Sequence, residues 1–167
     1  MKLLGAGFLW ISLTCLGAVY AHRLKSRITL LEKTQLLINK LKVGTEFLGL
    51  SAYEILKSIS DSEQLPELDY IDSTKALISK GADFPVAWNK GLKNTSLEYT
   101  SEEKEMLFNL GKNLGTSDIK NQVAMLEMYE KSFCEFSNAA KSRYSKQAKT
   151  VSLSTALVGC LLFISLI

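Results

Sequence analysis

Two uncharged apolar stretches, one at each end of the chain, restrict its fold more than any other feature of the sequence. Residues 3–21 and residues 151–167 contain no charged side chain. Because a helix rises about 1.5 Å per residue, stretches of this length approach or match the roughly 30 Å apolar core of a bilayer. We therefore expect transmembrane helices at residues 1–21 and 151–167, joined by a domain at residues 22–150.

Basic residues flank both stretches on the side of the central domain, and such residues stay on the cytoplasmic side of a membrane. They are Arg23, Lys25 and Arg27 after the first stretch, and Lys141, Arg143, Lys146 and Lys149 before the second. The segment Val19-Tyr20-Ala21 resembles a signal peptidase site, but the charges that follow it favour a retained span. The sequence thus predicts a cell-membrane protein with residues 22–150 in the cytoplasm.

The net charge of +3 conceals an uneven distribution along the chain. Residues 22–42 and 136–150 are basic, whereas residues 43–135 hold nine Lys against sixteen Asp and Glu, a net charge of −7. Basic residues beside the spans suit anionic lipid headgroups, so the lipid bilayer is an expected partner. An acidic central domain would be repelled by phosphates, so we expect no nucleic-acid partner.

The sequence contains no recognisable catalytic, cofactor-binding or metal-binding pattern. The three cysteines, Cys15, Cys134 and Cys160, are too far apart for a zinc or disulfide motif, and the only histidine, His22, lies at the predicted membrane surface. Neither a phosphate-binding GxxxxGK[ST] loop nor a GxGxxG loop after a strand is present. We therefore expect a protein that is not an enzyme and that uses no cofactor or metal.

Apolar residues recur at helical spacing throughout the central domain, and no alternating strand pattern appears. The pattern predicts an all-α fold, a six-helix cytoplasmic bundle whose first and last helices extend into the bilayer. The expected helices cover residues 24–42, 51–61, 66–81, 83–92, 100–115 and 118–149.

Local signals define several of these helix ends. Ser51 with Glu54, and Thr100 with Glu103, fit the capping box that begins a helix. Pro66 fits the first position of the third helix. Two glycines near the end of the first helix, Gly44 and Gly49, are expected to loosen the chain. Trp88 is expected in the core, among other large side chains, in preference to a ligand-stacking position.

Residues 107–122 form a corner in which one helix ends and the next begins. Leu107, Leu110 and Leu114 lie on one helical stripe, at spacings of three and four residues. Gly115 follows the stripe and is expected to adopt a positive φ, as a glycine does at a helix end.

The residues after Gly115 can begin the next helix. Ser117 and Asp118 both carry side-chain oxygens that accept from free N–H groups at a helix start. Asp118 and Gln122 lie four residues apart on one face, so we expect polar contacts from both, within the chain or with a partner. Whether the corner is structural or a docking site is left open.

The chain resembles the stage III sporulation protein AB family in this corner and in several other segments. The matching corner residues are Leu110, Gly111, Leu114, Gly115, Ser117, Asp118 and Gln122, after Ser101, Glu102, Glu103 and Glu105. The resemblance extends to both spans, residues 22–25, Glu46 and the segment 84–88 that contains Trp88. The chain departs from the family at residues 49–51, where a Thr-Pro-Leu turn is usual, and at the start of the last span, which is usually Gly-rich.

The resemblance implies a multiprotein assembly of endospore-forming bacteria in the mother-cell membrane around the forespore. That assembly is similar to specialised secretion systems, and the cytoplasmic domain is similar to the platform protein of type II secretion and type IV pilus machines. We accordingly expect a non-enzymatic platform or assembly subunit of a secretion-like channel between mother cell and forespore, required for endospore formation. Its expected partners are other subunits, above all a secretion-type ATPase, and self-association is left open. The alternative is a membrane-anchored helical adaptor or signalling protein with no transport role.

Overall fold

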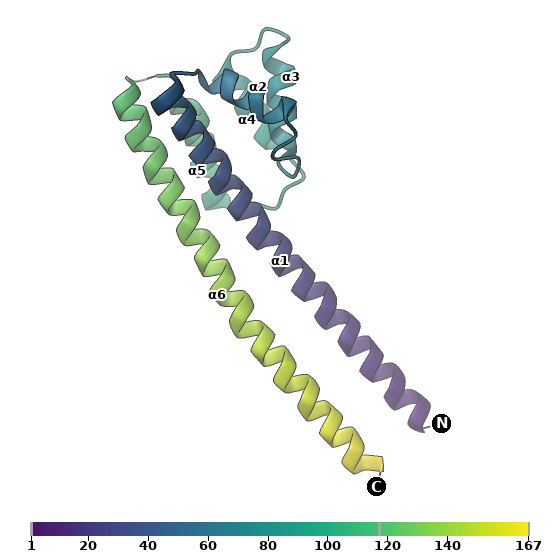
Figure 1. Ribbon diagram of the computed structural model, residues 1–167. Helices are drawn as coiled ribbons and strands as arrows, with labels where there is room; N and C mark the ends of the chain where they lie inside the picture. The colour runs from purple at the N-terminus through teal and green to yellow at the C-terminus, as the bar shows by residue number, and fades with distance from the viewer. Residues whose placement is uncertain (1, 117, 167) are drawn as a thin grey trace. The chain divides into compact units, whose positions relative to one another are not determined.

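The computed structural model describes the backbone of residues 2–116 and 118–166, and the side chains of residues 22–116, 118–147 and 150. Over that part of the chain the structure has six helices and no strand (Figure 1). The helices are α1 (Lys2–Leu48), α2 (Ala52–Asp61), α3 (Asp69–Ile78), α4 (Phe84–Asn94), α5 (Ser101–Asn113) and α6 (Ile119–Leu166). The prediction of an all-α fold with six helices is confirmed.

The chain divides into two compact units. One unit is Leu30–Phe136, and the other combines Met1–Thr29 with Ser137–Ile167, so α1 and α6 each contribute to both units. The predicted transmembrane segments, residues 1–21 and 151–167, lie outside the residues whose side chains the structure describes. Among the residues whose side chains the structure describes, no helix is both long and apolar enough to cross a membrane.

Two capping boxes begin α2 and α5, as predicted. The Ser51 hydroxyl accepts from the Glu54 N–H at 3.3 Å, and the Glu54 carboxylate accepts from the Ser51 N–H at 2.8 Å. Thr100 and Glu103 repeat this arrangement at 3.3 and 2.9 Å. Each box satisfies two backbone N–H groups for which the helix has no carbonyl partner. The two helix starts are therefore determined by local sequence.

The start of α3 differs from the prediction. The helix begins at Asp69 and not at Pro66, which lies in the preceding turn that Leu68 closes by donating to the Leu65 carbonyl at 3.1 Å. The Asp69 carboxylate accepts from the hydroxyl of Thr95 and from the N–H of Ser96 in the loop after α4. A contact between segments 26 residues apart thus defines this region, and no local signal reports it.

Gly44 does not loosen the chain, so that prediction is wrong. The helix α1 continues through Gly44 to Leu48, and only then does Gly49 adopt a φ of +60°. A Cβ on Gly44 would lie 2.6 Å from Cδ1 of Ile55 on α2. The missing side chain therefore allows α1 and α2 to approach closely, which is a tertiary requirement.

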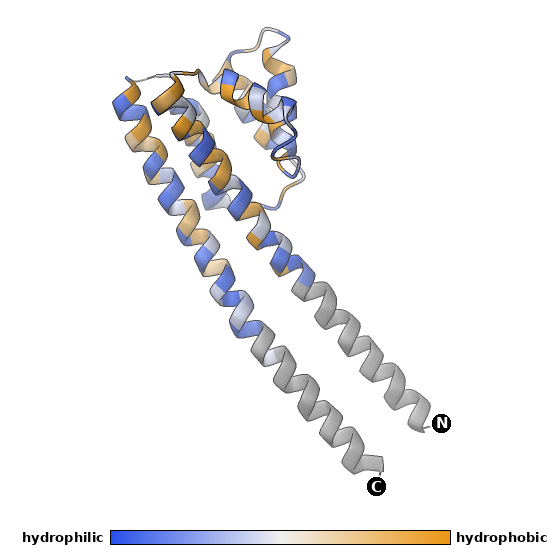
Figure 2. Ribbon diagram, viewed as in Figure 1, coloured by the Kyte–Doolittle hydropathy of each residue, from blue (hydrophilic) through white to orange (hydrophobic). Residues whose placement is uncertain are grey.

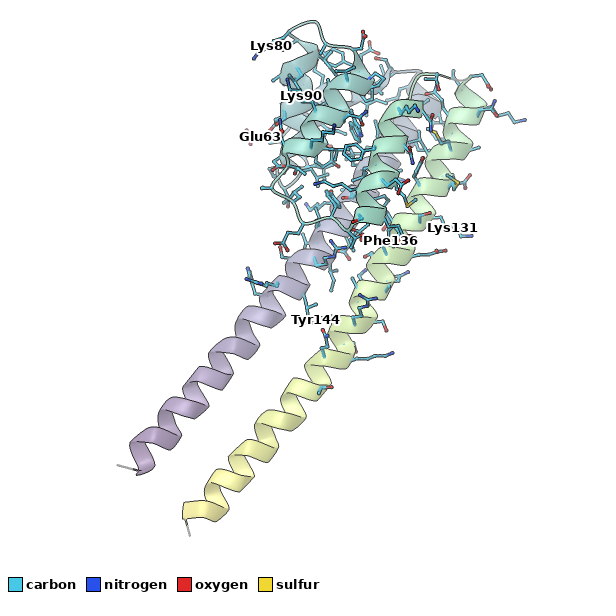
Figure 3. The ribbon with its side chains drawn as sticks, turned by 180° about the vertical axis from the view of Figure 1, so that it is seen from behind. Glu63, Lys80, Lys90, Lys131, Phe136 and Tyr144 are labelled. Atoms are coloured by element: carbon cyan, nitrogen blue, oxygen red, sulfur yellow. The ribbon has the colours of Figure 1, made fainter. Side chains whose placement is uncertain are left out.

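The core of the Leu30–Phe136 unit is assembled from the apolar faces of all six helices. Its fully buried side chains include Leu31, Leu37, Ile38, Leu41, Leu56, Ile71, Trp88, Leu92, Leu107, Leu110, Leu126 and Phe133. Apolar and polar residues interleave along the described parts of α1 and α6 (Figure 2). Charged side chains such as Glu63, Lys80 and Lys90 point away from the helices (Figure 3) and are exposed. This amphipathic arrangement is what the helical spacing predicts.

A polar clamp joins α1 to α6 beside this core. Glu130 accepts from the amide of Asn39 at 2.9 Å and from the ammonium of Lys42 at 2.5 Å. Burial would raise the pKa of Glu130, but the hydrogen bonds from Lys42 and Asn39 hold it below its usual value. Within this unit α1 and α6 lie side by side and run antiparallel (Figure 1).

The clamp predicts a loss of stability in acid. Because the pKa of Glu130 is lower in the folded state, its stabilisation is present above the pKa of an unfolded glutamate, about 4.3, and disappears as the pH falls through the folded value. Urea unfolding of the full-length protein should show Glu130→Gln less stable by about 1–2 kcal/mol at pH 7, with a smaller difference at pH 3.5. Glu127→Gln, an exposed neighbour, is the control and should change little. An equal loss at both pH values would contradict the assignment.

Candidate functional site

The predicted corner lies between the end of α5 at Asn113 and the start of α6 at Ile119. Gly115 has a φ of +82°, so the predicted positive φ is confirmed. A Cβ at Gly115 would meet no atom within 4 Å. The glycine is therefore required by backbone conformation and not by space.

Asp118 and Gln122, from which polar contacts are predicted, both make contacts within the chain. The Asp118 carboxylate accepts from the N–H of Asn121 at 3.4 Å, which makes Asp118 the cap of α6. The side-chain carbonyl of Gln122 accepts from the N–H of Gly115 at 3.3 Å. Gln122 thereby ties the first turn of α6 back to the end of α5. Ser117 lies outside the described residues.

The leucines and the first glycine of the corner belong to the core. Leu107, Leu110 and Leu114 are all buried, which confirms the predicted stripe. Gly111 is buried against Trp88, and a Cβ there would lie 2.5 Å from Nε1 of the indole and closer still to Cδ1. The two glycines of the Leu-Gly-x-x-Leu-Gly segment therefore have different roles. Gly111 provides space, whereas Gly115 provides a backbone conformation.

Trp88 is the side chain that occupies this space. It is fully buried, and its Nε1 donates to the carbonyl of Leu107 at 2.7 Å. The prediction that Trp88 is a core residue is confirmed. The hydrogen bond joins α4 to α5 one helical turn before Gly111, so the indole contacts α5 by both its ring and its polar atom.

Further aromatic side chains surround Trp88. Tyr70 packs edge-on against the indole with ring centroids 5.4 Å apart, and Phe84 stacks on it at 5.8 Å. Tyr99 lies 6.4 Å from Tyr70, and its hydroxyl is 2.7 Å from that of Thr34 on α1. The cluster therefore connects α1, α3, α4 and the loop before α5 to the corner.

The two tyrosines of this cluster remain protonated at physiological pH. Burial raises the pKa of Tyr70 well above its usual value, and the adjacent Tyr99 adds to this effect. Burial also raises the pKa of Tyr99 to about 12, although the hydrogen bond to Thr34 opposes the change. Neither side chain is therefore present as a phenolate near neutral pH.

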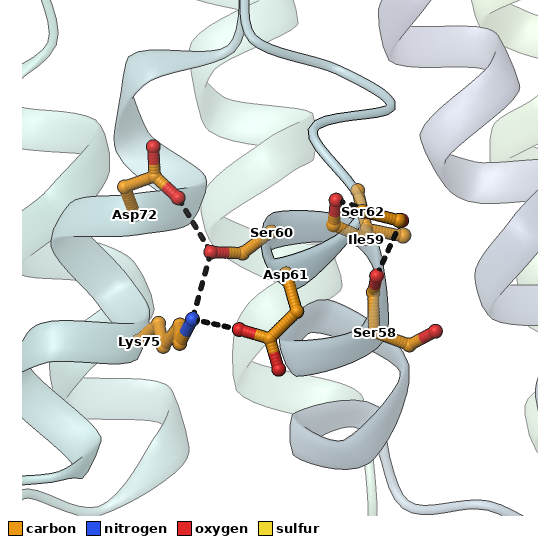
Figure 4. A network of polar contacts seen from close by, with 7 residues as sticks. All are labelled: Ser58, Ile59, Ser60, Asp61, Ser62, Asp72 and Lys75. Carbon is orange, nitrogen blue, oxygen red and sulfur yellow. Dashed lines mark hydrogen bonds and ion pairs between the residues drawn. The ribbon is translucent and has the colours of Figure 1, made fainter.

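A serine beside a lysine occurs between α2 and α3, where it could be mistaken for a nucleophile and its base. The Lys75 ammonium donates to the Ser60 hydroxyl at 3.1 Å, and that hydroxyl donates to Asp72 at 2.7 Å (Figure 4). Lys75 also donates to Asp61, and this hydrogen bond raises the pKa of Lys75. The lysine therefore keeps its proton and cannot accept one from Ser60.

The hollow beside Ser60 is small. Its volume is about 40 Å³, and its lining residues are Ile59, Ser60, Glu63, Leu65, Pro66, Ile71 and Asp72. Ligand sites usually enclose roughly 300–1,000 Å³. Within the part of the chain that the structure describes, no group of three or more His, Cys, Asp or Glu residues could hold a metal ion. The geometry therefore assigns no catalytic chemistry to these residues.

Comparison with known proteins identifies the family. The profile of the family described as stage III sporulation protein AB matches residues 2–167. The chain belongs to this family. No curated protein and no solved structure is similar enough to be matched to the chain. The resemblance carried by the corner and by the segment around Trp88 is thus confirmed over nearly the whole length.

Two residues of this stage III sporulation protein AB family member that make close tertiary contacts were not identified from its sequence. Glu130 is one, and Gly91 is another, because a Cβ on Gly91 would lie 2.6 Å from the Thr74 hydroxyl and 3.0 Å from the Tyr70 carbonyl. Gly91 did carry a signal, since a glycine inside a helical pattern often marks a close approach. Glu130 carried none, because its partners are about 90 residues away.

Substituting the two glycines of the corner should separate their roles. Gly111→Ala should lower the free energy of unfolding by about 3 kcal/mol, since the new methyl group would overlap the Trp88 indole. Gly115→Val should lower it by roughly 1–2 kcal/mol through backbone strain, and Gly115→Asn by less, because asparagine tolerates a positive φ. Urea unfolding of the full-length protein, followed by circular dichroism, measures all three. A Gly111→Ala protein as stable as the wild type would refute the Trp88 contact as a constraint.

Two substitutions of Asp118 should decide between the structural and docking interpretations of the corner. Asp118→Ala removes the cap of α6 and should cost about 1 kcal/mol, whereas Asp118→Ser can still accept from Asn121 and should cost much less. If capping is the only role, Asp118→Ser should also sporulate normally. A stable Asp118→Ser protein that fails in a sporulation assay would instead make the carboxylate a docking group.

Proposed function

We propose that this protein is a non-enzymatic, membrane-anchored platform subunit of a secretion-like channel complex between the mother cell and the forespore. Membership of the stage III sporulation protein AB family, over residues 2–167, is the observation that carries the proposal. The family relates the chain to sporulation. The platform role, the channel and the mother-cell membrane are our extensions of that relationship.

The lengths of α1 and α6 support a platform role. The two helices have 47 and 48 residues, and each contributes to both compact units. Both also include an apolar terminal stretch, which we propose as the transmembrane segments, with residues 22–150 in the cytoplasm. In this arrangement a displacement of the helical unit would be transmitted through two continuous helices to the bilayer.

The chemistry of the described residues also suits an assembly subunit. The polar side chains at the corner and in the clamp between α1 and α6 are used for caps, for ties between helices and for ion pairs. The glycines at the helix crossings hold the helices close together. Side chains used in this way hold the helices together, as we expect of an assembly subunit that catalyses no reaction. Its proposed partners are the other subunits of the complex, in particular a secretion-type ATPase.

Co-purification from sporulating cells tests the proposal. Full-length tagged protein should retain the secretion-type ATPase and other subunits of the complex after membrane solubilisation. Gly111→Ala, which should weaken the helical unit, is the matched control and should retain much less at the same expression level. If the wild-type chain retains none of these subunits, the adaptor or signalling role replaces the platform role.

Reporter fusions test the proposed membrane arrangement. A reporter that is active only outside the cytoplasm should be active when fused after Ile167 and inactive when inserted into the loop at residues 95–99. Activity of a cytoplasmic reporter after Ile167 would exclude two spans with a cytoplasmic domain between them.

A further inference from the structure

The end of α1 exposes two large apolar side chains next to each other. Phe47 is 72% exposed and Leu48 is 66% exposed, which makes them the most exposed large apolar residues in the described part of the chain. Single exposed apolar residues are ordinary on protein surfaces, but an exposed phenylalanine beside an exposed leucine is an unfavourable arrangement in water. The core of this unit does not cover these two side chains.

The helix presents these two side chains on a well-formed end. Gly49 has a φ of +60° directly after the helix, and the N–H of Leu50 donates to the carbonyl of Gly44 at 3.1 Å, which ties the end of α1 back to its last turns. The last core residue before this end is Thr45. The final residues of α1 thus continue the helix beyond its own core contacts. Phe47 and Leu48 are consequently held on ordered backbone.

Negative charge accumulates next to these apolar side chains. The pKa of Lys42 is raised by its hydrogen bond to Glu130 and by the nearby charges of Glu130, Glu127 and Glu46. Glu130 pairs with Lys42, and Glu46 and Glu127 add two further carboxylates to the surroundings of that pair. Both carboxylates belong to exposed residues.

The antiparallel pairing of α1 and α6 explains why these groups share one surface. Glu46 lies about one turn after Lys42 on α1, and Glu127 lies about one turn before Glu130 on α6. Because the helices run in opposite directions, both steps lead from the Lys42–Glu130 pair toward the end of α1. The two carboxylates therefore lie toward the end of α1, the same end at which Phe47 and Leu48 are exposed.

We propose that Glu46, Phe47, Leu48 and Glu127, the α1-end surface, dock a protein segment in which lysine or arginine side chains flank apolar residues. Phe47 and Leu48 would supply the buried centre of the contact, and the two carboxylates would face the basic groups at its rim. Charge complementarity selects this occupant. A second copy would present its own carboxylates, and an anionic bilayer would repel the surface. The identification of the partner as another subunit of the complex rests on the proposed function.

Photo-crosslinking in sporulating cells identifies the occupant. A benzoylphenylalanine placed at position 47 of the full-length chain should crosslink to a peptide that carries lysine or arginine within one helical turn of apolar residues. The same probe at Val86, an exposed apolar residue of α4 (59% exposed), is the control and should not crosslink to that peptide. A crosslink at position 47 to a second copy of the chain or to lipid, or no crosslink at all, would overturn the proposal.

Substitutions test the chemistry of the contact. Phe47→Ser with Leu48→Ser should reduce recovery of the crosslinked partner with the tagged chain by at least about tenfold, as expected for aromatic and apolar contacts at the centre of an interface. Since both side chains are already exposed, the unfolding midpoint should not fall. Val86→Ser is the control and should leave recovery unchanged. Glu46→Lys with Glu127→Lys should also reduce recovery by at least about tenfold. Unchanged recovery after this charge reversal would exclude a basic partner.

The outcomes separate this inference from the proposed function. If wild-type protein retains the subunits of the complex and the Phe47 and Leu48 substitutions leave that retention unchanged, the α1-end surface is not a docking site and the platform role stands. If wild-type protein retains no subunit but position 47 still crosslinks to a basic and apolar segment, the platform role fails and the docking surface stands.

Discussion

The contact between Trp88 and α5 is the interaction on which the rest of the helical unit depends. The indole occupies the space left by Gly111 and donates to the carbonyl of Leu107 at 2.7 Å. Tyr70 and Phe84 pack against its faces and edges. Because interiors are close-packed, a large side chain at the centre of three helices determines how far apart they can lie. The position of α5, and hence of the corner after it, follows from this packing.

Glycines that leave space for a side chain of a neighbouring helix also occur at two other helix crossings of the unit. Gly44 allows Ile55 of α2 to approach α1, and Gly91 allows Thr74 of α3 to approach α4. With Gly111 these glycines define a small unit whose helices lie close together, while polar ties such as the Glu130 clamp fix its first and last helices. These contacts lie in the Leu30–Phe136 unit, to which α1 and α6 each contribute one part of their length. Its chemistry is that of packing and capping.

Much of the fold could be predicted from local sequence. The capping boxes at Ser51 and Thr100 begin helices as predicted, and Gly115 has the positive φ expected at a helix end. These features depend on residues within a few positions of one another. The start of α3 and the role of Gly44 were predicted wrongly, because contacts with Thr95, Ser96 and Ile55 decide them. Gly111 of the corner and Trp88 of α4 were each identified from the sequence, but their contact was not.

The sequence by itself determined the family, the all-helical fold, the acidic central segment and the capped starts of α2 and α5, since each of these depends on composition or on residues close together in the chain. Only the tertiary structure decided which glycines provide space and which provide backbone freedom, and that Asp118 and Gln122 bond within the chain. It also decided that Phe47 and Leu48 are exposed, and that Glu46 and Glu127 lie near the Lys42–Glu130 pair. The physical reason is distance along the chain. Burial and charge pairing involve residues that lie tens of positions apart in the chain. The spacing of apolar residues in the sequence predicts that a helix face is apolar, but it does not predict which residues cover that face.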